Sequence, residues 1–141
     1  MKSIATFQPA AEFLVEDEWR ALLSGPRAVL LIGRVEQTSL LIASLLPSWP
    51  APIEICRAAT FTPDTAIRTL VLQDASEMSR ARQASLLGWL NETADHTRVI
   101  VTERQPLFPS VESGRFSSAL YYRLNTITID FTDSRRYDGP C

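Results

Sequence analysis

Residues 28–46, AVLLIGRVEQTSLLIASLL, decide the fold class. They open with an uninterrupted apolar run, residues 28–33, which is typical of a short strand buried on both faces of a parallel sheet. Residues 36–46 are long enough for a helix, and Pro47 ends it because a proline ring cannot continue a helix. We therefore predict a strand, a turn at Gly33 and a helix.

The rest of the chain continues this alternation of strands and helices. The other predicted strands are residues 53–56, 69–72, 98–102 and 125–131, the last an edge strand because its apolar and polar residues alternate. The other predicted helices are residues 12–24 and 80–91, the second with Ser79 as its N-cap, and a short helix after Pro63 stays open. This order predicts one α/β domain over residues 1–141, with a mainly parallel five-stranded sheet covered by helices on both faces.

Composition excludes several functional classes. The longest apolar stretches fall far short of the roughly 20 residues that cross a bilayer, and no apolar region of a secretory signal follows Lys2. We therefore expect a cytoplasmic protein without membrane contact. The formal net charge is −2, and the sequence has no block of basic residues of the kind that binds phosphate backbones. Direct nucleic-acid binding is therefore not expected.

Cysteine and histidine give no sign of a metal centre. Cys56 lies in an apolar run and is expected to be a buried thiol, whereas Cys141 ends the chain. His96 is the only histidine and lies in a polar stretch, where a solvated side chain is expected. Neither a disulfide framework nor a metal cluster is predicted.

Three strings resemble a known family when they are read together. Residues 68–79 read RTLVLQDASEMS and lead into RQASLLGWL at residues 82–90, RVIVT occupies residues 98–102, and GRFSSALYYRLN occupies residues 114–125. The strings resemble the ATPase domain of sigma-54-dependent transcriptional activators, a branch of the AAA+ family, in which the last string reads GxFRxDLYYRLN. The resemblance implies a three-layer α-β-α fold of the P-loop NTPase type.

The resemblance places the phosphate-binding loop at residues 33–40, GRVEQTSL. A working loop needs glycines, so that consecutive amides can face the phosphates, and a lysine that reaches the β and γ phosphates. Only Gly33 keeps a glycine, Glu36 and Thr38 stand where the other glycines belong, and Ser39 takes the lysine position. We expect ATP binding in the usual mode to be weak or absent. Gly33 then serves as a simple turn, and Arg34 is either a substitute phosphate partner or a solvated surface residue.

The acidic pair that would hold magnesium becomes Gln73 and Asp74. Glutamine is a poor ligand for a hard cation, so the implied metal site loses charge. Both residues alternatively just end a buried strand. The asparagine that would position the attacking water corresponds to Glu103. We therefore predict no catalytic residue and no required cofactor, with ATP and magnesium as the only candidates.

The family's two interface arginines correspond to Ser117 and Arg123. Arg123, together with Tyr122, is the candidate contact to another subunit; an ion pair supporting the Tyr121-Tyr122 turn is the open alternative. Residues 57–68 form only a short link where the family has an insert with a GAFTGA loop, so a sigma-factor contact through that loop is not expected. The lid and helix-turn-helix domains are likewise expected to be absent.

The leading hypothesis is a degenerate, catalytically silent AAA+ module in transcription regulation or assembly. Its expected partner is a full-length activator of the same family or a second copy of the chain. The alternative is a nucleotide binder or slow NTPase that uses a remnant site of Gly33, Arg34, Thr38, Ser39 and Asp74. A fragment of a longer regulator, or a product without a present role, also stays open.

Overall fold

The computed structural model describes residues 20, 22, 28–64, 66–93 and 97–132. Arg20 and Leu22 are helical, and the rest of the helix expected over residues 12–24 lies outside the described residues, as do His96 and Cys141. Leu22 is fully buried.

Five strands form one parallel sheet in the described part of the chain. They are β1 (Ala28–Ile32), β2 (Ile53–Arg57), β3 (Thr69–Gln73), β4 (Arg98–Glu103) and β5 (Ile127–Asp130). Their order is β2-β3-β4-β1-β5, and every pairing is parallel. In the central register, Leu30 of β1 lies opposite Val101 of β4 and Thr128 of β5. The predicted parallel five-stranded sheet is confirmed, with β5 at one edge.

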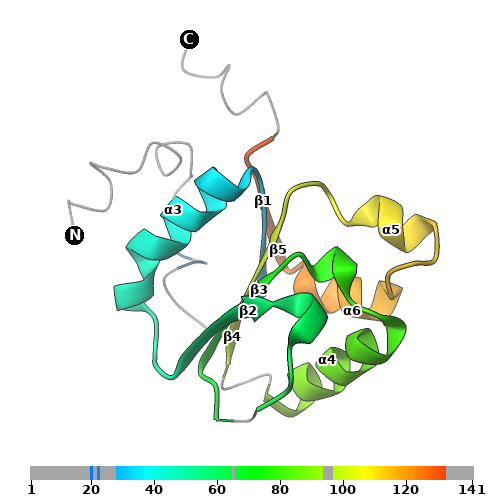
Figure 1. Cartoon of the computed structure of the whole chain (residues 1–141), viewed down its shortest axis with the longest axis horizontal. Helices are drawn as coiled ribbons and strands as arrows, with labels where there is room; N and C mark the ends of the chain where they lie inside the picture. The colour runs from blue at the N-terminus through cyan, green and yellow to red at the C-terminus, as the bar shows by residue number, and fades with distance from the viewer. Residues whose placement is uncertain (1–19, 21, 23–27, 65, 94–96, 133–141) are drawn as a thin grey trace.

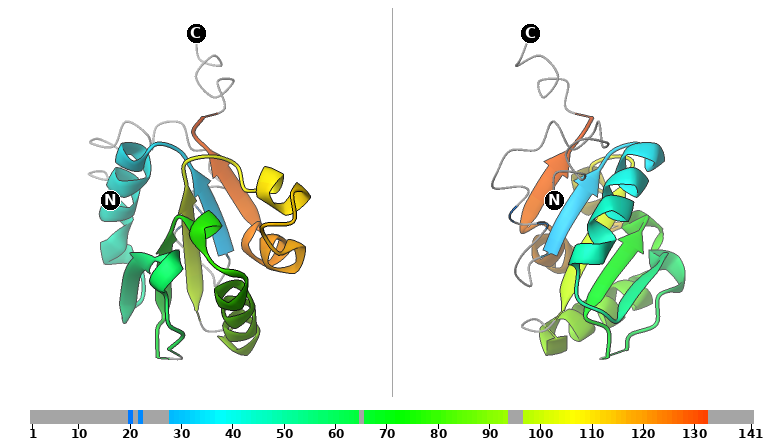
Figure 2. Two further views of the ribbon diagram at one scale, coloured as in Figure 1. Left: turned by 45° about the vertical axis from the view of Figure 1, so that its right-hand side comes forward. Right: turned by 90° about the vertical axis from the view of Figure 1, so that its left-hand side faces the viewer.

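Helices cover both faces of this sheet, as Figures 1 and 2 show. One face carries α3 (Val35–Leu45), and the other carries α4 (Arg80–Thr93), α5 (Phe108–Glu112) and α6 (Ser118–Leu124). Single 3₁₀ turns are η2 (Leu46–Ser48), η3 (Ala58–Thr60) and η4 (Ala75–Glu77). The expected three-layer α/β fold is therefore confirmed.

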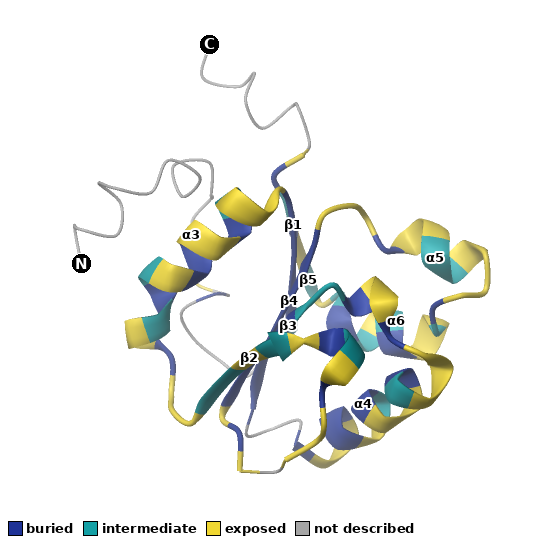
Figure 3. Cartoon of the chain, viewed as in Figure 1, coloured by how far each residue is buried: buried dark blue, intermediate teal, exposed yellow. Residues whose placement is uncertain are grey.

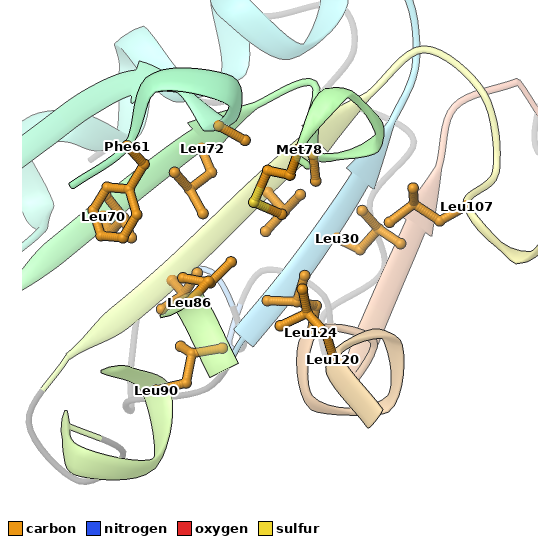
Figure 4. Close-up of a cluster of buried hydrophobic side chains, with 14 of the residues drawn as sticks. Leu30, Phe61, Leu70, Leu72, Met78, Leu86, Leu90, Leu107, Leu120 and Leu124 are labelled. Atoms are coloured by element: carbon orange, nitrogen blue, oxygen red, sulfur yellow. The ribbon is translucent and has the colours of Figure 1, made fainter. Parts of the chain in front are cut away.

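The hydrophobic core consists of two clusters, one on each face of the sheet. Successive residues of a strand point to opposite faces, so Leu30 and Ile32 pack with α4 and α6, whereas Val29 and Leu31 pack with α3. Figure 3 shows the buried strands between helices whose outer faces are exposed. The larger cluster is drawn in Figure 4, where leucines of β1, β3, α4 and α6 meet Phe61 and Met78.

Most predicted elements occur within a few residues of their expected bounds. Ser79 caps α4 as expected, because its hydroxyl accepts a hydrogen bond from the Arg82 amide at 3.2 Å. The short helix considered after Pro63 is absent from the described residues there, which form only a turn and a bend. The helices α5 and α6 were not predicted, and Ser117 caps α6 by accepting from the Leu120 amide at 3.1 Å.

The expectation of a buried Cys56 was wrong. The residue is only partly buried, because β2 is an edge strand whose residues are all intermediate or exposed. Burial still raises the pKa of the Cys56 thiol to about 11, with the Glu54 carboxylate as a further cause. The thiol is therefore protonated at neutral pH and a weak nucleophile.

A buried amide links α4 to the segment that leads into α6. The Gln83 side chain donates to the Met78 carbonyl at 3.1 Å and the Arg115 carbonyl at 3.0 Å, and it accepts from the Ser117 amide at 2.7 Å. Three of its four hydrogen-bonding positions are thereby used, so its burial is compensated. This network fixes the start of α6 against α4.

Candidate functional site

The carboxyl ends of the parallel strands bring the candidate residues to one edge of the sheet. The Gly33 amide donates to the Glu103 carbonyl at 2.9 Å, which joins the end of β1 to the end of β4. The Asp74 amide donates to the Thr102 carbonyl, also at 2.9 Å, and this joins the end of β3 to β4. Residues 33, 74 and 103, which are distant in sequence, therefore lie on three neighbouring strands.

The turn between β1 and α3 is short, and its amides are used within the protein. The helix begins at Val35, only two residues after Gly33. The Arg34 amide donates to Oε1 of Gln37 at 3.0 Å, and the amides of Gln37 and Thr38 donate to the Arg34 carbonyl at 2.9 and 3.1 Å. A phosphate loop instead presents consecutive amides to a ligand.

Gly33 is buried against the end of the sheet. A Cβ atom at this position would lie 2.9 Å from Oε1 of Gln37 and 3.2 Å from both Cβ and Cδ2 of Phe131. The absence of a side chain therefore allows Phe131 and Gln37 to pack directly on the turn.

Three of the five residues of the predicted remnant site share a cleft. Thr38, Ser39 and Asp74 line a space of about 100 Å³ between α3 and the end of β3. Arg34 is exposed and lines a separate hollow of about 270 Å³ beside Phe131. The Thr38 hydroxyl is buried and lies 3.4 Å from the carbonyls of both Arg34 and Val35, inside its own helix. Gly33 lines neither of these two spaces.

An arginine that the sequence analysis did not single out neutralises Asp74. Nη2 of Arg57 lies 3.1 Å from Oδ2 of Asp74 and 2.6 Å from Oε1 of Glu77. The hydrogen bond to Glu77 is the main cause that raises the pKa of Arg57. Arg57 is opposite Gln73 in the register of β2 and β3, so this contact depends on strand pairing. The Arg57 guanidinium therefore contacts the Asp74 carboxylate, the group that was expected to face a magnesium ion.

Glu103 is a buried carboxylate at the same edge. Glu103 is only 6% exposed. Its side-chain oxygens accept hydrogen bonds from the Ser76 amide at 2.6 Å and from the Ser76 hydroxyl at 3.2 Å. Burial raises the pKa of Glu103 to about 7; nearby Asp74 and Glu77 add to the rise, and the Ser76 hydrogen bonds oppose it. A pocket of about 400 Å³ opens beside it, between η4 and Ser110.

Tyr122 and Arg123 lie on α6, away from this edge. Tyr122 is 66% exposed, and its ring lies 5.2 Å from the Tyr121 ring in an edge-to-face contact. Arg123 donates to the Leu90 carbonyl at 2.7 Å and to the Asn91 side chain at 3.3 Å, both on α4. Among the described residues, Arg123 thus bonds the C-terminal part of α4 instead of forming the ion pair that would support the Tyr121-Tyr122 turn. A cation is favourable at that end of a helix because the helix dipole is negative there.

Comparisons with known proteins identify the family. A family model described as the sigma-54 interaction domain matches residues 20–133. The chain belongs to this family. It is an AAA+ domain with a P-loop NTPase fold, as its resemblance implied.

Solved structures share this fold at low sequence identity. NtrX from Brucella abortus in complex with ATP has a TM-score of 0.68 and 17% identity, over 88% of this chain and 35% of its own. The P-loop NTPase domain of a sigma-54 transport activator from E. coli has a TM-score of 0.55 and 18% identity, over 73% and 94% of the two chains. RuvB T158V from Thermotoga maritima has a TM-score of 0.56 and 15% identity, over 91% and 49%.

The match to this chain covers about a third of the length of each NtrX chain. No curated protein matches the chain. Among residues 28–64, 66–93 and 97–132, no three histidine, cysteine or acidic side chains are arranged to hold a metal ion. The described helices include none with the length and apolarity to span a bilayer.

Packing at Gly33 can be tested on the protein without any ligand. Gly33→Ala should lower the free energy of unfolding by about 1–3 kcal/mol, because Phe131 has to move away from the added methyl group. Gly88→Ala is the matched control: apart from its chain neighbours and the backbone of its own helix, no atom lies within 4 Å of the added Cβ, and helix propensity predicts a gain of about 0.5–1 kcal/mol. Urea unfolding measures both. Unchanged stability in Gly33→Ala would show that the turn is open.

Proposed function

We propose that this domain is a sigma-54-type AAA+ module that does not hydrolyse ATP and that acts in transcription regulation as an assembly partner, in the cytoplasm. The observation that carries the proposal is the β1–α3 turn, where the amides that would wrap a phosphate donate to Glu103, Gln37 and Arg34. A nucleotide would have to break these contacts before it could bind.

Charge at the turn supports the same conclusion. A phosphate loop supplies a lysine ammonium, whereas Ser39 stands at that position and Glu36 lies in the first turn of α3. A carboxylate close to a triphosphate repels it, at a cost of about 1 kcal/mol per charge pair in water and several kcal/mol in a partly buried site. Arg34 is the remaining cation of the turn and is exposed.

The residues at the ends of β3 and β4 do not fit a magnesium-assisted hydrolysis site. Gln73 is neutral, and the Asp74 carboxylate is paired with Arg57, so a metal ion would have to compete with a guanidinium that is already bound. Glu103 adds a third carboxyl group instead of a neutral amide that could orient a water molecule. The proposal therefore requires no cofactor.

An exposed aromatic surface on α5 and α6 supports a partner role. Tyr122 is 66% and Phe108 41% exposed, and Tyr121 lies between them with its ring 5.7 Å from Phe108. Aromatic residues with polar ends are enriched at protein interfaces. The proposed partner is a full-length activator of the same family or a second copy of the chain. The described residues 58–64 and 66–68 form a 3₁₀ turn and irregular backbone, and no sigma-factor contact is proposed there.

A second function, nucleotide binding with slow hydrolysis, has one observation in its favour. Thr38, Ser39 and Asp74 lie in a common cleft with the cationic Arg57. The cleft measures only about 100 Å³, whereas small-molecule sites usually occupy about 300–1,000 Å³. A nucleotide would therefore need α3 or Arg57 to move, which makes this function the weaker candidate.

Nucleotide titration separates the two functions. We expect no saturable heat on titrating ATP and magnesium into the domain and no phosphate release, because the turn is filled. The same assays on an intact ATPase of the family provide the positive control. Saturable binding, with hydrolysis that falls in Asp74→Asn, would establish the second function instead; asparagine tolerates the left-handed backbone at this position, where φ is 60°.

Association through α6 is measured by sedimentation and by pull-down with a full-length activator. Tyr122→Ala should weaken the association at least about tenfold, since the few hot-spot residues of an interface, among which tyrosine is enriched, each cost about 2 kcal/mol or more when truncated. Leu40→Ala on α3 is the control, because Leu40 is 49% exposed on the opposite face of the sheet. Equal effects of the two variants, or the absence of any association of the unmodified domain, would refute the partner surface.

A further inference from the structure

The outer side of β2 is open in the described part of the chain. β2 is the first strand in the order β2-β3-β4-β1-β5 and pairs there only with β3. The Pro52 carbonyl accepts from the Thr69 amide at 3.1 Å, and in a parallel pair every second residue directs its amide and carbonyl to the same neighbour. The backbone groups that point away from β3 are therefore those of residues 53, 55 and 57. Among the described residues, one contact reaches these groups, from the Thr60 hydroxyl to the Arg57 carbonyl at 3.3 Å.

An exposed apolar side chain lies at the middle of this open strand. Ile55 is 44% exposed, and the other large apolar side chains that the structure describes as exposed lie on helices. Figure 3 shows β2 partly exposed beside inner strands that are buried. Ile53 packs on the core beneath α3, and Ile55 points to the same face because it lies two residues further along the strand. The open edge therefore combines unpaired backbone groups with an apolar side chain.

The other edge strand, β5, is different. The Phe131 amide donates to the Ile32 carbonyl at 2.7 Å, so the residues of β5 that point their backbone away from β1 are Thr128 and Asp130. Both are polar, and Asp130 also accepts from the Thr132 amide at 2.8 Å. Polar and charged residues are the usual means by which a protein prevents a second chain from pairing with an edge strand. β2 has an apolar residue at the equivalent central position.

A second copy of β2 matches this edge in an antiparallel arrangement. With a two-fold axis at Ile55, this residue lies opposite Ile55 of the second copy, and Ile53 lies opposite Arg57 of the second copy. Each of these residue pairs exchanges two backbone hydrogen bonds, so every outward group of the strand gains a partner. The axis is perpendicular to the sheet, so α3 of both copies stays on the same face and the two Ile55 side chains meet there.

Charge and strand length select this register. An axis at Glu54 would place two carboxylates directly opposite each other, which is destabilising. An axis at Cys56 would leave Ile53 beyond the paired strand, opposite the 3₁₀ turn of the second copy. With the axis at Ile55, Glu54 lies opposite Cys56 of the second copy, whose thiol is neutral at pH 7 because its pKa is raised to about 11.

We propose that β2 is a docking strand for a second copy of this chain, and that the two sheets join into one across a two-fold axis at Ile55. Such a contact uses the same surface on both copies, so it closes after two chains and leaves no open β2 edge for further growth. It lies on β2 and is separate from the aromatic surface of α5 and α6, so it does not rest on the partner role proposed for that surface.

A disulfide across the axis tests the register. In the full chain with Cys56→Ser and Cys141→Ser, Ile55→Cys should give an intermolecular disulfide on mild oxidation, because the Cα atoms of such a pair lie about 5.5 Å apart. Ile53→Cys is the matched control on the same strand. Its two copies lie about 14 Å apart along the strands, beyond the roughly 7 Å that a disulfide spans. Non-reducing electrophoresis measures both yields.

Sedimentation under reducing conditions measures the dimer itself. The unmodified chain should approach twice its monomer mass of 15.8 kDa as its concentration rises. Ile55→Lys should weaken dimerisation at least about tenfold, because two ammonium groups then replace an apolar contact at the axis. Leu40→Lys is the control, since Leu40 is 49% exposed on α3 and should tolerate the charge without effect on the dimer.

Three results would overturn the docking strand. They are equal disulfide yields in Ile55→Cys and Ile53→Cys, a mass that stays at 15.8 kDa at every concentration, and equal weakening by Ile55→Lys and Leu40→Lys. If Ile55→Lys does not fold, the disulfide yields decide. Tyr122→Ala should leave the Ile55→Cys yield unchanged, so failure of the docking strand and failure of the α6 surface are separate results.

Discussion

The hydrogen bond from the Gly33 amide to the Glu103 carbonyl sets the geometry on which the carboxyl edge depends. It fixes the start of α3 next to the end of β4 and leaves only Gly33 and Arg34 between β1 and the helix. Gln37 can then bond the Arg34 amide, and Phe131 can pack on the turn. The family fold is kept, and the side chains of Gln37 and Phe131 pack against the turn at Gly33.

The same edge carries its own charge compensation. Two carboxylates, Asp74 and Glu77, share the guanidinium of Arg57, and burial raises the pKa of a third carboxyl group, Glu103, to about 7. In a hydrolytic site of this fold, acidic side chains have a metal ion and a nucleotide to interact with. In this chain, Asp74 and Glu77 contact Arg57, and Glu103 contacts Ser76.

The sequence predicts the sheet well because each strand is a separate apolar run, and residues 28–33 show the pattern most clearly. It does not reveal α5 and α6, since five and seven residues are too few for a helical period to emerge. The Arg57 contact depends on the β2–β3 register, and the hydrogen bonds that Glu103 accepts from Ser76 depend on the position of η4. Tertiary structure creates both features, so residue spacing alone could not indicate them.

The filled turn is tested most directly by amide hydrogen exchange across residues 33–38 of the domain without nucleotide. The structure predicts protection at Gly33, Arg34, Gln37 and Thr38, whose amides donate within the protein. It also predicts that Gln37→Ala releases the Arg34 amide while Gly33 stays protected. Exchange at the intrinsic rate throughout this segment, with protection gained only when ATP and magnesium are added, would contradict the account.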